Sequence, residues 1–201
     1  MTRDHATFTS LHHRNFRLFF FGQGISQVGN WLTLVAQSLF VLHLGGNGLS
    51  VGVLSACQFL PVLLLGAYGG LVADRSDKRT LLLAVQAGAM VQSFALAYVA
   101  WRPHPAIVAV DAVAFCGGIA MAFDNPARRS LFVELVPARD VTNAVGLNST
   151  LMTSSRIVGP ALAGLLIQTA GFAWCFVVDV SDDLAATELG LFAWQIGRAH
   201  V

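Results

Sequence analysis

The chain contains uncharged stretches that are far too long for the core of a small soluble domain. No Asp, Glu, Lys or Arg occurs between Leu18 and Ala73, and none occurs between Thr80 and Trp101. Of the 201 residues, 55% are hydrophobic and only 11% are charged, whereas soluble domains carry about 25% charged residues. Such a chain cannot cover a soluble core with polar surface, so the sequence predicts a membrane protein. The formal net charge of +1 argues against nucleic acid as a partner.

Five segments are long enough to cross a bilayer as helices. A spanning helix needs about 20 mainly apolar residues, and Gly and Pro mark the junctions between the segments. A membrane β-barrel would instead show short segments of alternating hydrophobicity. The sequence therefore predicts an all-α polytopic membrane protein. The predicted spans are residues 18–43, 50–73, 80–101, 105–124 and 142–168.

Basic residues lie almost entirely on one side of these spans. Only Arg102 lies on the opposite side, which is a strong positive-inside signal. We therefore expect a multi-pass protein of the cell membrane with a cytoplasmic N-terminal tail, residues 1–17. The basic residues also predict an attraction to the headgroups of anionic membrane lipids. The nine bases on the predicted cytoplasmic side are Arg3, Arg14, Arg17, Arg75, Lys78, Arg79, Arg128, Arg129 and Arg139.

The sequence GGLVADRSDKRT concentrates charge between the second and third spans. Gly70, with no side chain, is interpreted as a point where another helix approaches closely. Asp74 can pair with a base or face a helix N-terminus, and Arg75 is suited to bidentate pairing with a carboxylate. With Lys78 and Arg79, these residues predict an ionic latch that holds one conformation and releases another. The alternative is an ordinary basic cytoplasmic loop.

This loop resembles a signature of the major facilitator superfamily, in the loop between helices 2 and 3, with Asp77 where Gly is usual. A second stretch, SRIVGPALAG, resembles the Gly-Pro motif in helix 5 of antiporters and drug exporters of that superfamily. In it, Pro160 is expected to kink the helix. Gly159 and Gly164 are expected to leave a groove for a neighbouring helix. The alternative is a generic kink, because Gly and Pro are frequent in membrane helices.

A third stretch extends the resemblance to the subgroup that contains the enterobactin exporter and related multidrug efflux proteins. It runs from Asp124 to Gly164, and the whole resemblance covers residues 14–179. The resemblance implies six helices in each half, 3+3 inverted repeats and a substrate cavity between two halves. Residues 18–179 would then form the N-terminal half of the helical bundle.

The function that this resemblance implies is secondary active transport. The implied activity is export of small amphipathic or siderophore-like molecules by alternating access, with the proton as coupling ion. The missing C-terminal half would be needed for transport. The alternative is a non-transporting half-length remnant, or a helix bundle that depends on a partner.

Two charged residues lie inside predicted spans, where charge is costly and commonly functional. Asp111 lies in the fourth span and Arg156 in the fifth. They could pair with each other across the interface between these spans, serve substrate or proton, or lie near the membrane surface. Asp111 is the better proton candidate, because proton coupling needs a group that titrates. Many proton-coupled members of the superfamily carry an Arg in the middle of helix 4, which this chain lacks.

Neutral polar residues follow one another along the first span. Gln23, Gln27, Asn30 and Thr33 occur at three- and four-residue spacing, so they would share a helix face. We interpret them as a stripe that lines a cavity, with hydrogen bonding between helices as the alternative.

The sequence does not indicate an enzyme or a metal site. HExxH does not occur, and the GxSxG match at residues 48–52, GLSVG, lies at the start of the second predicted membrane span rather than between a strand and a helix. Cys57, Cys116 and Cys175 lie within apolar runs without ligand-like spacing. They are interpreted as buried thiols, and no disulfide, metal or cofactor is expected.

The end of the chain does not continue the pattern of apolar spans. Asp182, Asp183 and Glu188 interrupt what would be a sixth span. The final letters, IGRAHV, could be encoded by a string that resembles a common sequencing-library adapter. We therefore expect a truncated or replaced sixth helix and an aberrant tail over residues 180–201, arising from sequencing or assembly. The alternative is a natural amphipathic C-terminal segment.

Overall fold

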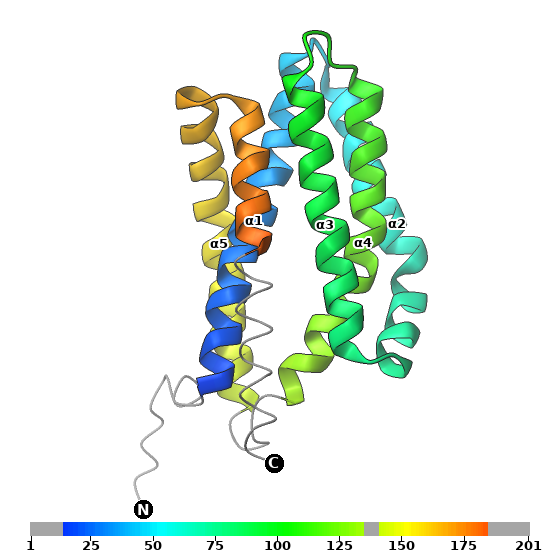
Figure 1. The fold of residues 1–201 in the computed structure, drawn as a ribbon, viewed down its shortest axis with the longest axis vertical. Helices are drawn as coiled ribbons and strands as arrows, with labels where there is room; N and C mark the ends of the chain where they lie inside the picture. Colours follow the sequence, from blue (N-terminus) through cyan, green and yellow to red (C-terminus); the bar gives the residue numbers. More distant parts are fainter. Residues whose placement is uncertain (1–13, 135–140, 185–201) are drawn as a thin grey trace, which may run out of the picture.

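The computed structural model describes residues 14–134 and 141–184, and within these ranges every long element is a helix (Figure 1). A further helix, residues 172–184, follows the fifth and is drawn in orange to red. The five long helices are α1 (Arg14–His43), α2 (Gly48–Arg75), α3 (Lys78–Trp101), α4 (Ile107–Glu134) and α5 (Val141–Thr169).

All five predicted spans are found, and the main difference lies at the end of α4. The predicted span stops near residue 124, but α4 continues through Pro126 to Glu134. Proline leaves the carbonyl four residues earlier without its helical donor, which here is the carbonyl of Ala122. That carbonyl lies against Gly69 of α2, where a side chain would clash with it. α2 thus approaches the α4 backbone closely at this point, and α4 continues past a proline that the sequence alone marked as a helix end.

Two further boundaries differ from the sequence-based expectation. α1 begins at Arg14, so the end of the predicted N-terminal tail is helical. The helix 172–184 runs through residue 180 without a break. The predicted boundary at residue 180 thus lies within a helix, and residues 185–201 lie outside the described part. The origin of the residues after Val180 stays a prediction.

The turns between helices have local causes that can be read from the sequence. Asn47 caps α2 in a capping box with Ser50, in which each side chain bonds the backbone N–H of the other residue. At the opposite end of the bundle, Asp77 caps α3 through the backbone N–H of Thr80 at 3.2 Å. Gly45 and Gly171 follow α1 and α5 with φ of 87° and 90°, a conformation in which glycine has no steric penalty.

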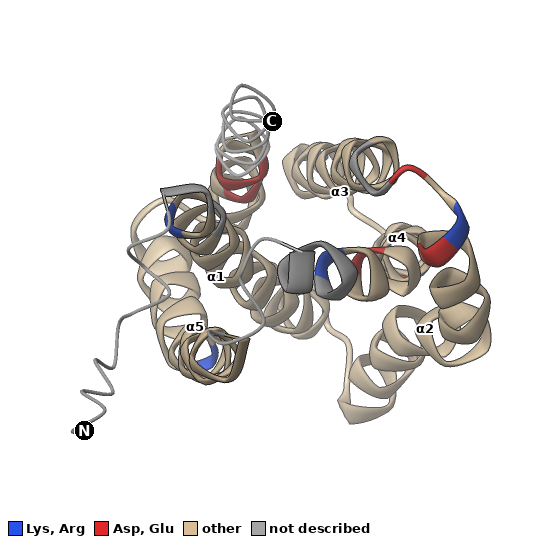
Figure 2. Ribbon diagram, turned by 90° about the horizontal axis from the view of Figure 1, so that it is seen from below, with Lys and Arg blue, Asp and Glu red and all other residues tan. Residues whose placement is uncertain are grey.

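The packing of the helices follows the inverted-repeat arrangement that the resemblance implies. α2 packs mainly against α4, and α1 mainly against α5; these two pairs exchange when helices 1–3 are mapped onto helices 4–6. α3 also packs against α4. The helix 172–184 lies beside α1, with the Phe40 and Phe172 rings 5.1 Å apart, and beside α3, with the Trp101 and Trp174 rings 6.3 Å apart (Figure 2).

Glycines allow the closest contacts between helices, but not all the glycines that were predicted to do so. Gly69 faces the α4 backbone, whereas Gly70 has nothing within 4 Å of where its Cβ would lie. A Cβ on Gly159 would lie 2.5 Å from the Cβ of Trp31, whereas Gly164 has no such neighbour. Within the described residues Gly159 makes a close helix contact, whereas the close approaches at Gly70 and Gly164 stay predictions. Gly69 and Gly70 are helical neighbours that point about 100° apart, so they face different surroundings.

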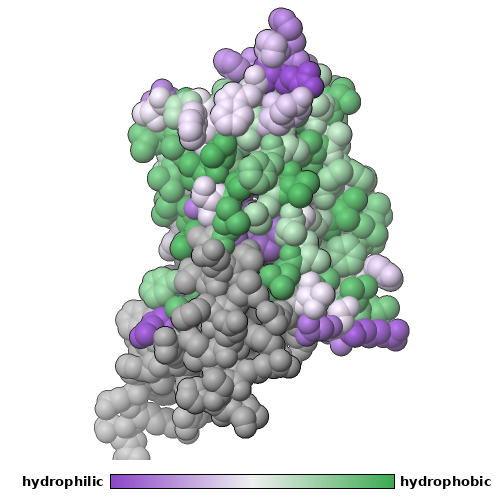
Figure 3. Space-filling model, viewed as in Figure 1, coloured by the Kyte–Doolittle hydropathy of each residue, from purple (hydrophilic) through white to green (hydrophobic). Residues whose placement is uncertain are grey.

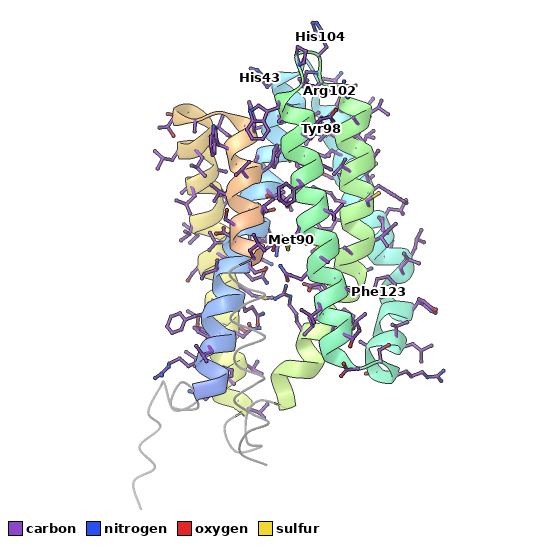
Figure 4. All side chains as sticks on the ribbon, in the orientation of Figure 1. His43, Met90, Tyr98, Arg102, His104 and Phe123 are labelled. Carbon is purple, nitrogen blue, oxygen red and sulfur yellow. The ribbon has the colours of Figure 1, made fainter. Side chains whose placement is uncertain are left out.

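The surface of the bundle is suited to lipid. All five long helices meet the length and composition of a membrane span, and large apolar side chains such as Leu63 and Val108 are exposed. Figure 3 shows a hydrophobic band between two hydrophilic ends. At the end that holds the α3–α4 turn, Arg102 donates to the Tyr98 hydroxyl at 2.7 Å (Figure 4). Such aromatic and basic pairs are typical of a membrane–water interface.

Candidate functional site

Arg156 of α5 lies over Trp31 of α1. Its guanidinium carbon is 5.2 Å from the centre of the Trp31 ring, which is within cation–π range. Among the described residues, Arg156 forms no ion pair. The predicted pairing with Asp111 is therefore not present. The reason is the packing, because α5 lies mainly against α1 while α4 lies mainly against α2 and α3.

Asp111 sits in a different part of the bundle, near the start of α4. It is half-buried, and its Oδ1 atom is buried without a hydrogen-bond partner in the described part of the chain. Its predicted role as a proton or substrate site stays a prediction.

The polar stripe predicted on α1 divides into two sets in the structure. Gln23 is buried and donates to Oδ1 of Asn148 on α5 at 3.2 Å, while Gln27 is half-buried and Asn30 is exposed. Thr33 is buried and faces Asp179 on the helix 172–184. The stripe is thus a set of three residues, and Gln23 uses its amide for the interhelical bond that was the alternative interpretation.

An apolar groove of about 780 Å³ lies along the contact between α1 and α5, and neither Trp31 nor Arg156 lines it. Its walls come from α1, α5 and the helix 172–184, and none of the four predicted stripe residues lines it. Residues that line it include Phe21, Ile25, Val28, Leu147, Leu162 and Val178.

The sequence analysis missed a buried carboxylate on the helix 172–184. Asp179 is only 5% exposed, and its Oδ2 atom accepts a hydrogen bond of 2.6 Å from the Ser93 hydroxyl of α3. Its Oδ1 atom lies 2.6 Å from the position that a Cβ on Gly29 would take. Only a glycine at position 29 of α1 therefore leaves room for this carboxylate. The sequence signal was an acid within the apolar run CFVVDV, which the irregular tail behind it obscured.

A chain of polar contacts continues from this carboxylate toward the end of the bundle that carries the α2–α3 turn. Gln86 of α3 donates to Oδ1 of Asp183 at 2.6 Å and accepts from Arg128 at 2.8 Å. Arg128 in turn forms an ion pair with Asp124, with 2.7 Å between Nε and Oδ2. Because α4 extends past Pro126, Arg128 lies within that helix rather than in the predicted loop. The chain ties α3, α4 and the helix 172–184 together.

The predicted latch lies in the turn between α2 and α3. Asp74 and Arg75 are exposed and form no ion pair with any other described residue. Asp77, which replaces the usual Gly of the signature, caps α3. The side chains of Lys78 and Arg79 lie outside the described part of the structure. The latch therefore stays a prediction. Asp77, in the same turn, has a structural role as the cap of α3.

The cysteines differ from one another in exposure. Cys175 is buried, Cys57 is half-buried and Cys116 is exposed on the apolar surface. The prediction of a buried thiol is therefore wrong for Cys116, because its side of α4 is left uncovered. Within the described residues, no group of His, Cys, Asp or Glu could hold a metal ion.

Comparisons with known proteins agree with this architecture. The model of the family described as transmembrane secretion effectors, a family of major facilitator transporters, matches residues 5–199. The staphyloferrin A transporter of Staphylococcus aureus is 27% identical over 75% of this chain and 38% of its own length. Macrolide efflux protein A of Streptococcus pyogenes is 26% identical over 87% of this chain and 44% of its own. The enterobactin exporter of Shigella flexneri is 24% identical over 81% of this chain and 40% of its own length.

The chain thus spans about two fifths of the length of these curated relatives. The family model covers nearly all of the helical bundle. The relatives of the chain are transporters rather than enzymes. The chain belongs to the transmembrane secretion effector family of the major facilitator superfamily and corresponds to its N-terminal half.

Proposed function

We infer that the whole protein is a proton-coupled exporter of small amphipathic or siderophore-like molecules. Relatives named for efflux of a macrolide and export of enterobactin support this direction of transport. The chain would supply the N-terminal half of the bundle, and a second half would complete the substrate path. The N-terminus is placed in the cytoplasm by the positive-inside rule.

The observation that carries the proton-coupled part is the buried carboxylate of Asp179. The groups that face it are the Ser93 hydroxyl of α3 and the surfaces of Gly29 and Thr33 on α1. Its charged neighbours on the same helix, Asp182 and Asp183, are also acids.

The described base on α4 has other partners. Arg128 is held by Asp124 and Gln86. Ionisable side chains inside a membrane bundle commonly belong to proton relays. Asp179 therefore supplies a site that can bind and release a proton as the transporter changes conformation.

Alternating access also needs contacts that form in one state and break in the other. Asp74 and Arg75 are exposed and unpaired among the described residues, so they are available to a partner helix. That partner would come from the second half.

Replacing Asp74 with Asn is expected to reduce export severalfold without lowering the amount of protein in the membrane, because it removes the latch charge but leaves the apolar spans intact. Export rates and membrane abundance are measured together. Asp77→Asn is the matched control: it removes one charge from the same turn but keeps a good helix cap, so export should be nearly unchanged. Equal losses in both variants would show that net loop charge matters and would contradict a specific latch at Asp74.

The export activity itself is tested in cells that lack their own exporters. The whole protein is expressed, and retention of erythromycin, enterobactin and staphyloferrin A is compared with that in cells carrying an empty vector. Lower retention of at least one compound supports export. Higher accumulation would indicate import, and equal retention of all three would contradict the proposed substrate classes.

A further inference from the structure

Arg156 occupies the position in α5 at which a positive charge is hardest to accommodate. At 1.5 Å per residue it lies about 20 Å from either end of the helix, beyond the distance over which an arginine side chain reaches the membrane surface. It is exposed on the described bundle and pairs with no described carboxylate. Because charge at this depth faces water or a polar partner rather than lipid, this side of α5 borders a cavity in the whole protein.

Uncharged residues neighbour Arg156 along the contact between α1 and α5. Helical spacing places Ser149 and Met152 on its face of α5. On α1, Gln27 and Asn30 lie on the flank of the helix next to Trp31, and Trp31 itself is half-buried beneath the guanidinium. No acid of α1 or α5 competes for the guanidinium, because neither helix contains Asp or Glu.

The two side chains together favour one class of ligand. A guanidinium presents two parallel N–H donors that match the two oxygens of a carboxylate. The guanidinium covers one face of the Trp31 indole, and the half-buried ring system leaves an apolar part beside it for a planar group. The apolar groove offers no charge of this sign, since Asp182 is the charged residue that lines it.

On the basis of the transport function inferred above, we propose that Arg156 and Trp31 form a substrate subsite for a small organic anion. This subsite binds a carboxylate at Arg156 and a planar apolar group at Trp31. It lies near the bilayer midplane, where transporters of this architecture bind substrate. Of the amphipathic molecules considered for export, it selects those with a negative charge.

Trp31 provides a direct measure of binding. Benzoate is titrated into the purified whole protein in detergent while tryptophan emission is recorded, and the signal of the Trp31→Phe variant is subtracted. Benzamide is the matched probe, because it has nearly the same shape without the charge. Benzoate is expected to change the Trp31 emission saturably, whereas benzamide is expected to have little effect.

Variants of Arg156 test the origin of this binding. Arg156→Gln is expected to weaken benzoate binding by about tenfold or more, since hydrogen bonds to charged groups are the strong ones. Arg156→Lys should bind with intermediate affinity, because lysine keeps the positive charge but lacks the two parallel N–H donors of a guanidinium. Gel filtration and circular dichroism confirm that each variant is folded.

Three results would overturn the subsite: unchanged benzoate affinity in Arg156→Gln, equal binding of benzamide and benzoate, or no benzoate response at all. The last would mean that a carboxylate elsewhere in the whole protein already occupies Arg156. Because equilibrium binding needs no proton gradient, the two proposals fail separately. Benzoate binding without transport refutes the exporter, and transport without benzoate binding refutes the subsite.

Discussion

Replacing Asp179 with Asn is expected to remove the dependence of export on the proton gradient. The amide has nearly the same shape, and its oxygen can still accept the hydrogen bond from Ser93, so the helix packing is retained. The variant cannot exchange a proton. We expect the gradient-driven export rate to fall by about tenfold or more, which corresponds to a change of only about 1.4 kcal/mol in the barrier. The measurement is the export rate at a series of external pH values.

The matched variant is Asp111→Asn, which removes the carboxylate that was predicted inside the fourth span. Asp111 is half-buried near the start of α4, and Asp179 is almost fully buried against two helices. The pH profile of Asp111→Asn should therefore stay closer to that of the unmodified protein. A flat profile in Asp111→Asn with a normal profile in Asp179→Asn would transfer the coupling role to Asp111 and contradict the assignment.

The second large effect is expected at Gly159. Changing Gly159 to Ala places a Cβ 2.5 Å from the Cβ of Trp31 and 3.0 Å from the Leu32 nitrogen and the Val28 oxygen. Real Cβ atoms do not approach that closely, so α1 and α5 must separate. Overpacking of this kind costs about 1–3 kcal/mol. The measurement is the unfolding midpoint of the purified protein in detergent, which should fall.

Gly164→Ala is the control on the same helix. A Cβ there meets nothing within 4 Å, and replacing a helical glycine by alanine generally stabilises by about 0.5–1 kcal/mol. The two alanine variants should therefore shift the midpoint in opposite directions. Gly69→Ala and Gly70→Ala repeat the comparison on α2. Equal shifts within each pair would contradict the close helix contacts described for Gly69 and Gly159.

The helices could be predicted because long apolar runs leave few alternatives to a membrane span. Which face of each helix contacts a neighbouring helix could not be predicted equally well. Gly69 and Gly70 are adjacent and chemically identical, and only the position of α4 decides which of them makes the contact. Thr33 fits the spacing of the predicted stripe, but α1 turns it toward the helix 172–184.

The functional residues were harder to predict where they depend on partners far away in sequence. Asp179 gains its significance from Ser93 and Gly29, which lie on two other helices. Asp111 and Arg156 are both charged and both inside spans, so a pair between them was a reasonable hypothesis. The pairing of α1 with α5, and of α2 with α4, separates them, and no local pattern encodes that pairing.

The position of Arg128 could not be predicted from the sequence for a third reason. A proline two residues before it predicts the end of a helix, and its charge suggests a loop. In the structure the helix continues, and Arg128 connects Asp124 with Gln86 across the bundle. The Ala122 carbonyl lies against Gly69 of α2 at this point, a tertiary contact that the sequence does not reveal.

The central claim is tested most directly by measuring whether protons cross the membrane in the direction opposite to the substrate. The whole protein is reconstituted into vesicles that contain a pH-sensitive dye, and erythromycin, enterobactin or staphyloferrin A is added in the absence of any other gradient. Proton-coupled export predicts that a transported compound moves protons in the opposite direction, and that Asp179→Asn abolishes the dye signal while Asp111→Asn largely retains it. Substrate transport without any proton movement would contradict proton coupling, and with it the role assigned to Asp179.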